Sequence, residues 1–166
     1  AVSSVGGNSR PAGGADLSGD STRAEHMRIS LFTQSLFALP LQEALLAAHQ
    51  AGYRAVELAC AAPHMDLETA RRRAPAVAGL LASLELEVSA LSLFTAFTDA
   101  ETREEQVSAA CELIQLAPRF DTRVVKLTPG GPASADAVPA HWESLAAALQ
   151  PLSRAAADAG VVLAME

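Results

Sequence analysis

Hydrophobic positions recur in two alternating periods from residue 27 to the end of the chain. Short runs of mostly apolar residues fill five segments, 28–33, 54–60, 86–93, 122–128 and 161–166. Runs of this length are typical of strands that are buried on both faces of a parallel sheet. In each interval between two of these runs, apolar residues recur at three- and four-residue spacing, which predicts four helices.

The first interval shows the helical pattern clearly. Leu41, Ala44, Leu45 and Ala48 follow the i, i+3, i+4, i+7 spacing of a helix with one buried side. Gly52 is predicted to end this helix, because glycine tolerates the left-handed conformation that closes many helices.

Local signals set the boundaries of the last two helices. Thr98 and Glu101 have the spacing of a capping box, which predicts a helix start there. Trp142 stands at helical spacing with Leu145 and is predicted to pack its helix against the sheet. Gly160 is predicted to end that helix before the strand 161–166.

Strands that alternate with helices require a parallel sheet with right-handed crossovers. Two α/β architectures fit five strands and four helices: a flavodoxin-like open parallel sheet, or the first five strands of a (β/α)8 TIM barrel. No glycine-rich phosphate-binding motif follows any predicted strand, which disfavours the nucleotide-binding open sheets. An open sheet normally ends on a covering helix, so the strand-final order predicts a barrel cut short.

Residues 1–26 are rich in Gly, Ser and Ala, and we expect a disordered leader there. The remainder, 27–166, is interpreted as one partial TIM-barrel domain. The formal net charge of −7 argues against a nucleic-acid partner. No apolar stretch reaches the length of about 20 residues that a membrane helix needs, so no membrane association is expected. Cys60 and Cys111 lie in apolar runs without paired spacing, which predicts reduced core thiols and a cytoplasmic location.

Three segments form a recognisable set: 48–58, AHQAGYRAVEL; 124–131, VVKLTPGG; and 159–166, AGVVLAME. In this order they resemble the first helix with the second strand, the fourth strand and the fifth strand of the xylose-isomerase-like family of sugar phosphate isomerases and epimerases. The resemblance covers 27–166 and implies a closed barrel with its site at the carboxyl ends of the strands.

The resemblance also implies a chemistry. In this family a divalent ion, with Mn²⁺ or Mg²⁺ expected here, is held by carboxylates and a histidine from strands five to eight, and Glu166 takes the fifth-strand position. It would be both a metal ligand and one of the acid/base groups that move a proton through an enediolate. Because the other ligands are missing, the 166-residue chain alone is expected to be inactive.

Other polar and aromatic residues at strand ends are candidates for substrate contact. Glu57 either contacts substrate or pairs with an inner basic residue, for which strand alternation offers Lys126. His64 either contacts substrate or is an ordinary surface histidine. Phe32 and Phe94 end two strands and either line a pocket or fill the core.

Several functions remain open. The first is a metal-dependent sugar or keto-sugar isomerase or epimerase with a small-molecule sugar substrate, and a keto-inositol dehydratase would use the same proton abstraction. The second is a non-catalytic half-barrel, and the third a flavodoxin-like binding domain. Exposed strand edges favour pairing with another chain, so a homo-oligomer is expected.

Overall fold

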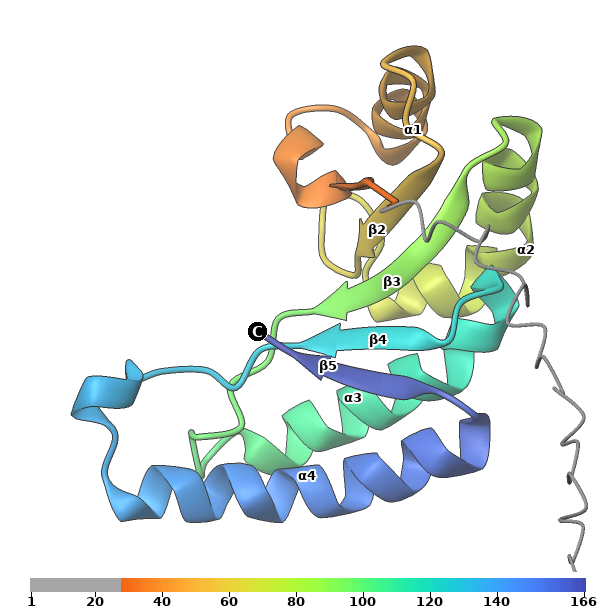
Figure 1. The fold of residues 1–166 in the computed structure, drawn as a ribbon. Helices are drawn as coiled ribbons and strands as arrows, with labels where there is room; N and C mark the ends of the chain where they lie inside the picture. Colours follow the sequence, from red (N-terminus) through yellow and green to blue (C-terminus); the bar gives the residue numbers. More distant parts are fainter. Residues whose placement is uncertain (1–27) are drawn as a thin grey trace, which may run out of the picture.

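The computed structural model describes residues 28–166, which form a five-stranded parallel sheet accompanied by four α-helices (Figure 1). The predicted leader, 1–26, lies outside the described residues. The strands are β1 (Ser30–Phe32), β2 (Ala55–Ala59), β3 (Glu87–Leu93), β4 (Val124–Leu127) and β5 (Val162–Met165). The helices are α1 (Leu41–Gln50), α2 (Leu67–Ser83), α3 (Arg103–Leu116) and α4 (Pro139–Ala159). All five predicted strands and four predicted helices are therefore confirmed.

The order of the strands decides between the two architectures. Neighbouring strands follow the order β1-β2-β3-β4-β5, and every pair is parallel. A flavodoxin-like sheet has the order 2-1-3-4-5, because its chain reverses direction at a switch point. In a (β/α)8 barrel each strand lies beside the next strand of the chain, so the sequential order found here is the order of a barrel. The flavodoxin-like alternative is therefore wrong, and the described residues form part of a (β/α)8 barrel.

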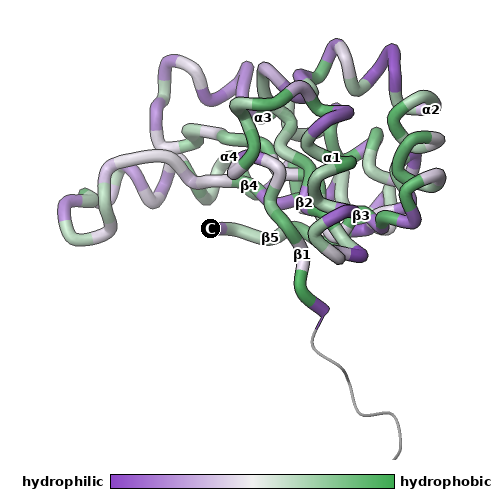
Figure 2. The backbone as a smooth tube through the Cα atoms, turned by 90° about the horizontal axis from the view of Figure 1, so that it is seen from above, coloured by the Kyte–Doolittle hydropathy of each residue, from purple (hydrophilic) through white to green (hydrophobic). Residues whose placement is uncertain are grey.

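The two faces of the sheet differ in burial. Figure 1 shows the helices following one side of the curved sheet, and the strand side chains that point toward them are fully buried. These are Val56, Leu58, Leu91, Val125 and Leu127, each 0% exposed. Burial of a side chain of this size contributes about 1.5–3 kcal/mol, so this layer is the main source of stability. In Figure 2 the hydrophobic stretches gather where strands and helices meet.

The observed ends of the helices test the boundaries that the glycines and the capping box predict. Gly52 has φ +87° directly after the last turn of α1, and Gly160 has φ +65° at the end of α4, so both predicted helix ends are confirmed. The predicted capping box is wrong. Helix α3 begins at Arg103, and the Thr98 hydroxyl instead donates to the carbonyl of Gly131. The Thr98 side chain therefore contacts a neighbouring loop, whereas the local motif predicted that it would cap the helix.

Strand β3 contains a bulge. Val56 pairs with Val88, whereas the next residue of β2, Glu57, pairs with Ala90, so Ser89 is an extra residue in β3. Its hydroxyl lies 2.7 Å from that of Ser30 and donates to the carbonyl of Val56 at 3.2 Å. A bulge of this kind re-aims the side chains that follow it.

The two cysteines are free, as predicted. Cys60 is 3% exposed, and this burial raises its thiol pKa to about 12 against a smaller opposing effect of a backbone hydrogen bond with Ser92. Cys111 is half-buried, and desolvation raises its pKa too.

We expect one thiol, that of Cys111, to react with a disulfide reagent at pH 8 in the native protein. Cys60 should react far more slowly, because only the thiolate is nucleophilic and burial keeps the Cys60 thiol both protonated and out of reach of the reagent. Timed thiol titration with and without guanidinium measures both sites, and Cys60→Ser should leave the native reaction unchanged. Two equally fast native thiols would contradict the expectation.

Candidate functional site

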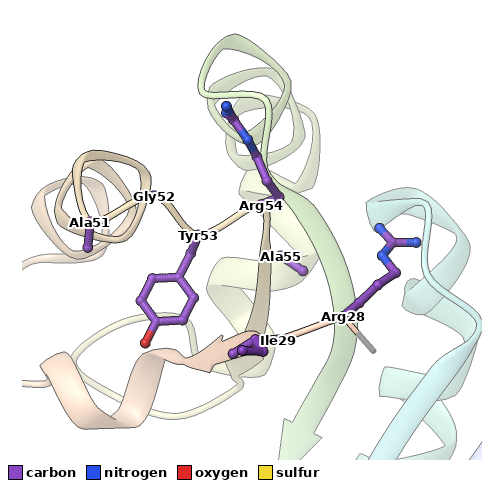
Figure 3. A pocket seen from close by; sticks show the side chains of 7 residues that line it. All are labelled: Arg28, Ile29, Ala51, Gly52, Tyr53, Arg54 and Ala55. Atoms are coloured by element: carbon purple, nitrogen blue, oxygen red, sulfur yellow. The ribbon is translucent and has the colours of Figure 1, made fainter. Parts of the chain in front are cut away.

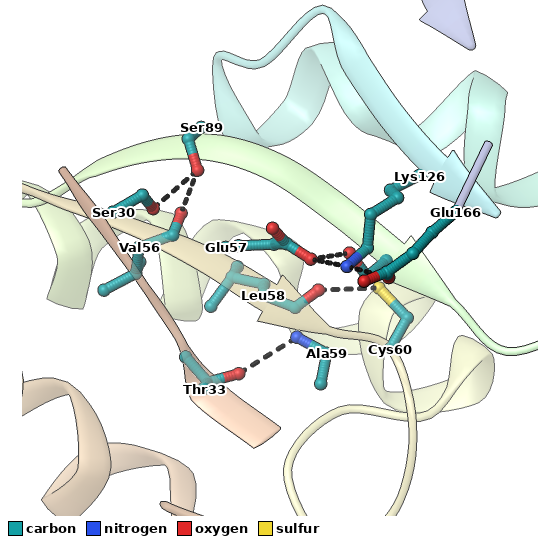
Figure 4. Close-up of polar contacts among 11 residues, drawn as sticks. Ser30, Thr33, Val56, Glu57, Leu58, Ala59, Cys60, Ser89, Lys126 and Glu166 are labelled. Carbon is teal, nitrogen blue, oxygen red and sulfur yellow. Dashed lines mark hydrogen bonds and ion pairs between the residues drawn. The ribbon is translucent and has the colours of Figure 1, made fainter. Parts of the chain in front are cut away.

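Three charged side chains, from the middle of β2, from β4 and from the residue after β5, meet on one face of the sheet (Figure 4), so Glu57 does not end its strand as predicted. The Lys126 ammonium lies 2.6 Å from Oε1 of Glu57 and 2.6 Å from Oε2 of Glu166. The pairing of Glu57 with Lys126 that strand alternation predicts is therefore confirmed, and Glu166 is a second partner. Parallel strands place their carboxyl ends at one edge, which is where barrel enzymes carry their functional groups.

Strand register explains why these residues meet. Phe32, the last residue of β1, pairs with Glu57, and Lys126 of β4 pairs with Ser92 of β3. Residues in register on neighbouring strands point to the same face. Glu166 follows β5 directly, and its backbone N–H donates to the carbonyl of Leu127 at 3.1 Å. The sheet thus places a residue from each strand around Lys126.

The surroundings of Lys126 are partly apolar. Its side chain is 17% exposed and that of Glu57 is 20% exposed, whereas Glu166 is 65% exposed. The ammonium lies 4.3 Å from the centroid of the Phe32 ring, a cation–π distance. Burial lowers the pKa of Lys126, but hydrogen bonds and charge attraction from Glu166 and Glu57 outweigh it and raise that pKa above its usual value. Lys126 is therefore held as a cation between the two carboxylates.

Comparison with known proteins identifies the fold's family. The family model described as xylose isomerase-like TIM barrel matches residues 45–166. The chain belongs to this family. No curated protein sequence matches it significantly.

Solved structures agree with this assignment. A xylose isomerase-like TIM barrel protein from Mycobacterium smegmatis in complex with magnesium has a TM-score of 0.67 and 18% identity, over 85% of this chain and 55% of that one. The 3-keto-D-glucoside 4-epimerase of E. coli has a TM-score of 0.66 and 14% identity, over 84% and 55%. An L-ribulose 3-epimerase has a TM-score of 0.60 and 22% identity, over 82% and 48%. At these identities the likeness shows the fold, and the chain spans about half the length of each relative.

The xylose isomerase-like barrel wall described here does not by itself fit a divalent ion. Residues 28–166 contain no group of three or more His, Cys, Asp or Glu side chains placed to hold one. The two carboxylates of the site, Glu57 and Glu166, both contact the Lys126 ammonium, which occupies the position a cation would take between them. Of the two, Glu166 is the more open.

His64 has a structural position in this xylose isomerase-like wall. It is 5% exposed, so the surface alternative is wrong. Its Nε2 lies 3.2 Å from the carbonyl of Leu36 and 3.0 Å from that of Leu39, and the ring meets Phe37 edge-on at 4.7 Å. His64 therefore ties the loop after β2 to the loop after β1. Its contact with substrate stays a prediction.

Aromatic rings border the charged cluster of the xylose isomerase-like wall. Phe32 ends β1 and Phe94 directly follows β3, with ring centroids 6.3 Å apart, and Phe94 is 41% exposed. Phe94 is therefore not a core residue. The pattern of the sequence missed Ser92, whose hydroxyl donates to Glu57, because the bulge shifts the alternation of β3 by one residue.

Two hollows lie at opposite ends of the xylose isomerase-like wall. The larger, about 580 Å³, is at the amino ends of β1 and β2, where Figure 3 shows the Tyr53 ring between Ala51 and Ile29, with the Arg54 side chain pointing away from both. That end of a barrel serves stability rather than chemistry. The smaller, about 240 Å³, lies beside Glu166 and is lined by Trp142. Trp142 is 52% exposed, so its predicted packing against the sheet is wrong.

Proposed function

We propose that this chain forms the first part of the catalytic barrel of a sugar or keto-sugar isomerase or epimerase. The observation that carries the proposal is the convergence of Glu57, Lys126 and Glu166 on the face of the sheet opposite the helices, with Glu166 directly after the carboxyl end of β5. The relatives named above as 3-keto-D-glucoside 4-epimerase and L-ribulose 3-epimerase support the substrate class. The substrate would be a small hydroxylated carbonyl compound, in a cytoplasmic protein.

Glu166 is the proposed base. Its carboxylate is exposed enough to meet a substrate, and an ionised carboxylate can take the proton from the carbon next to a carbonyl. Lys126 keeps a positive charge 2.6 Å from that carboxylate, which orients it before the reaction. Phe32 would form the apolar wall against the sugar, and Glu57 would accept a substrate hydroxyl.

We further propose that the complete protein uses a divalent ion, Mn²⁺ or Mg²⁺. Such an ion supplies Lewis-acid polarisation of neighbouring substrate oxygens. Glu166 would be its ligand from this chain, and the remaining ligands would come from strands beyond those described. Relatives solved with magnesium and with zinc support an ion in proteins of this fold.

A second candidate is a non-catalytic half-barrel that pairs with another copy of itself. Val162 is 63% exposed and Met165 is 41% exposed, on the strand that forms one edge of the described sheet. An exposed apolar edge strand readily pairs with another chain. Light scattering tests this: the candidate requires a dimer, and a monomer at all concentrations rules it out.

Proton exchange tests the proposed enzyme. In D₂O with Mn²⁺ added, the protein encoded by the reading frame extended beyond Glu166 should introduce deuterium next to the carbonyl of a ketose. Residues 1–166 alone should not. Glu166→Gln should lower the rate at least about a hundredfold, because it removes a general base. Glu68→Gln is the matched control, since Glu68 is 69% exposed on α2 and pairs with Arg72 rather than with a member of the charged cluster. A Glu166→Gln protein with the normal rate would contradict the proposal. An extended protein without further metal-ligating residues at its strand ends would contradict it too.

A further inference from the structure

A third hollow lies on the helical side of the sheet, between the first turn of α1 and one side of α2. It measures about 400 Å³, within the range of about 300–1,000 Å³ that small-molecule sites occupy. None of Glu57, Lys126 and Glu166 belongs to its lining. Because α1 and α2 follow consecutive strands, they are neighbours in a barrel, and further strands and helices would not come between them.

Arg73 gives this hollow a positive charge. It is the only member of the run 71–73 that belongs to the lining. Arg71 lies 2.6 Å from a carboxylate of α3, and Arg72 lies 3.2 Å from a carboxylate one turn earlier in α2. Within residues 28–166, no carboxylate lies within ion-pair distance of Arg73, and no Asp or Glu lines the hollow. The hollow is therefore positive on a chain whose formal net charge is −7.

The start of α1 brings hydrogen-bond donors to the same hollow. Leu41 and Gln42, the first two residues of this ten-residue helix, belong to the lining. Pro40 is in the N-cap position, and no side chain caps the helix there. The first N–H groups of a helix have no partner inside the helix, and together they favour an anion. The one acidic residue of this turn, Glu43, is not part of the lining.

His64 lines the hollow as well, and one of its nitrogens lacks a partner. Its side chain is 5% exposed, and its Nε2 faces the carbonyls of Leu36 and Leu39, so Nε2 carries a hydrogen. Its Nδ1 is buried and has no hydrogen-bond partner among residues 28–166. A buried polar atom without a partner is uncommon in native proteins and indicates that a group is missing from its surroundings. An anion in the hollow would favour the protonated ring by charge attraction.

We propose that this hollow binds a small organic carboxylate. The guanidinium fork of Arg73 matches the two oxygens of a carboxylate. Pro40, Val77 and Leu80 make much of the remaining lining apolar, which fits a hydrocarbon body and disfavours a bare inorganic anion. A single unpaired guanidinium suits one negative charge rather than a phosphate dianion. The site does not depend on the proposed enzyme, because the charged cluster lies on the opposite face of the sheet.

Benzoate is a suitable probe, because it joins one carboxylate to a flat apolar body. Residues 1–166 are titrated with benzoate and, in parallel, with benzamide, which has the same shape without the charge, and with inorganic phosphate. The Cε1–H resonance of His64 is followed by NMR and assigned by its loss in His64→Gln. We expect a saturable shift with benzoate, with a dissociation constant on the order of 1 mM, and none with benzamide or phosphate. The resonance of His141, on α4, should not move.

Three results would overturn the proposal. The first is a His64 resonance that benzoate leaves unchanged at concentrations well above that dissociation constant. The second is an equal response to benzamide, because the site would then not recognise the charge. The third is a saturable response to phosphate, which would indicate a site for inorganic anions.

Neighbouring arginines provide a matched pair of variants. Arg73→Gln should weaken benzoate binding about tenfold, because it removes charge-assisted hydrogen bonds. Arg72→Gln makes the same change of net charge one residue away, where the side chain pairs with Glu68, and should leave the affinity unchanged. Both arginines are exposed, so both variants should fold, which circular dichroism verifies. Equal affinities in Arg73→Gln and the parent protein, or equal losses in the two variants, would refute the site.

Discussion

Gly130→Ala should destabilise the native state by about 3 kcal/mol, one of the two largest effects of a single substitution that the structure predicts. Gly130 has φ +88°, and a Cβ atom there would lie 2.6 Å from the backbone Cα of Ala96. Backbone strain and a clash with an atom that cannot move aside therefore add. Urea unfolding followed by circular dichroism measures the free energy.

Two other glycines serve as controls for Gly130. Gly52 has φ +87° with nothing within 4 Å of an added Cβ, so Gly52→Ala isolates the strain and should cost about 1 kcal/mol. Gly131 has neither a positive φ nor a close neighbour, so Gly131→Ala should change stability by less than about 0.5 kcal/mol. If all three variants were equally stable, the tight contact between Gly130 and Ala96 would not exist in solution.

Lys126→Met should destabilise the fold by about 2 kcal/mol. Removing one partner of a fully buried ion pair costs about 3–5 kcal/mol, and the 17–20% exposure of Lys126 and Glu57 reduces that figure. Adding Glu57→Gln to Lys126→Met should recover part of the loss, because the more buried of the two carboxylates that lose their cation is then neutral and only the exposed Glu166 stays charged. Lys126→Arg keeps the charge and is the conservative control. Additive losses in the double variant would show that the two side chains are not coupled.

The same ion cluster predicts a dependence on alkaline pH. Because the pKa of Lys126 is raised in the folded state, its stabilising effect is complete below the unfolded pKa of about 10.4. The effect is lost as the pH rises through the folded value. Unfolding free energies of the parent and Lys126→Met proteins should therefore differ by a constant amount near neutrality and converge above about pH 10.5. A difference that stays constant above pH 10.5 would contradict the expectation.

The sequence predicts those parts of the fold that depend on local periodicity. The apolar runs gave the strands, and the partnership of Lys126 with Glu57 followed from alternation along β4. The order of strands did not follow from periodicity, because an open sheet and a barrel bury the same kinds of runs. Motif resemblance in the segment 48–58 supplied that choice.

Side chains that act across loops escaped prediction from local patterns. Thr98 has the spacing of a helix cap but donates to Gly131, thirty-three residues away. Trp142 matches the apolar spacing of α4 but lies at its edge, outside the buried stripe. His64 is held by two carbonyls of the preceding loop. The environment of each of these side chains depends on segments distant in sequence. A short window of one sequence does not show which distant segment will lie beside it.

The extra residue Ser89 reverses the alternation of side chains along β3, so that the residues before it and after it alternate out of step. Before it, Val88 faces the helices, and after it Leu91 does, while Ser92 faces the carboxylates. Loss of one residue from this strand would exchange the neighbours, presenting a leucine to Glu57 and a hydroxyl to the apolar layer. The strand can therefore vary in composition far more freely than in length, and insertions or deletions in related chains should avoid it.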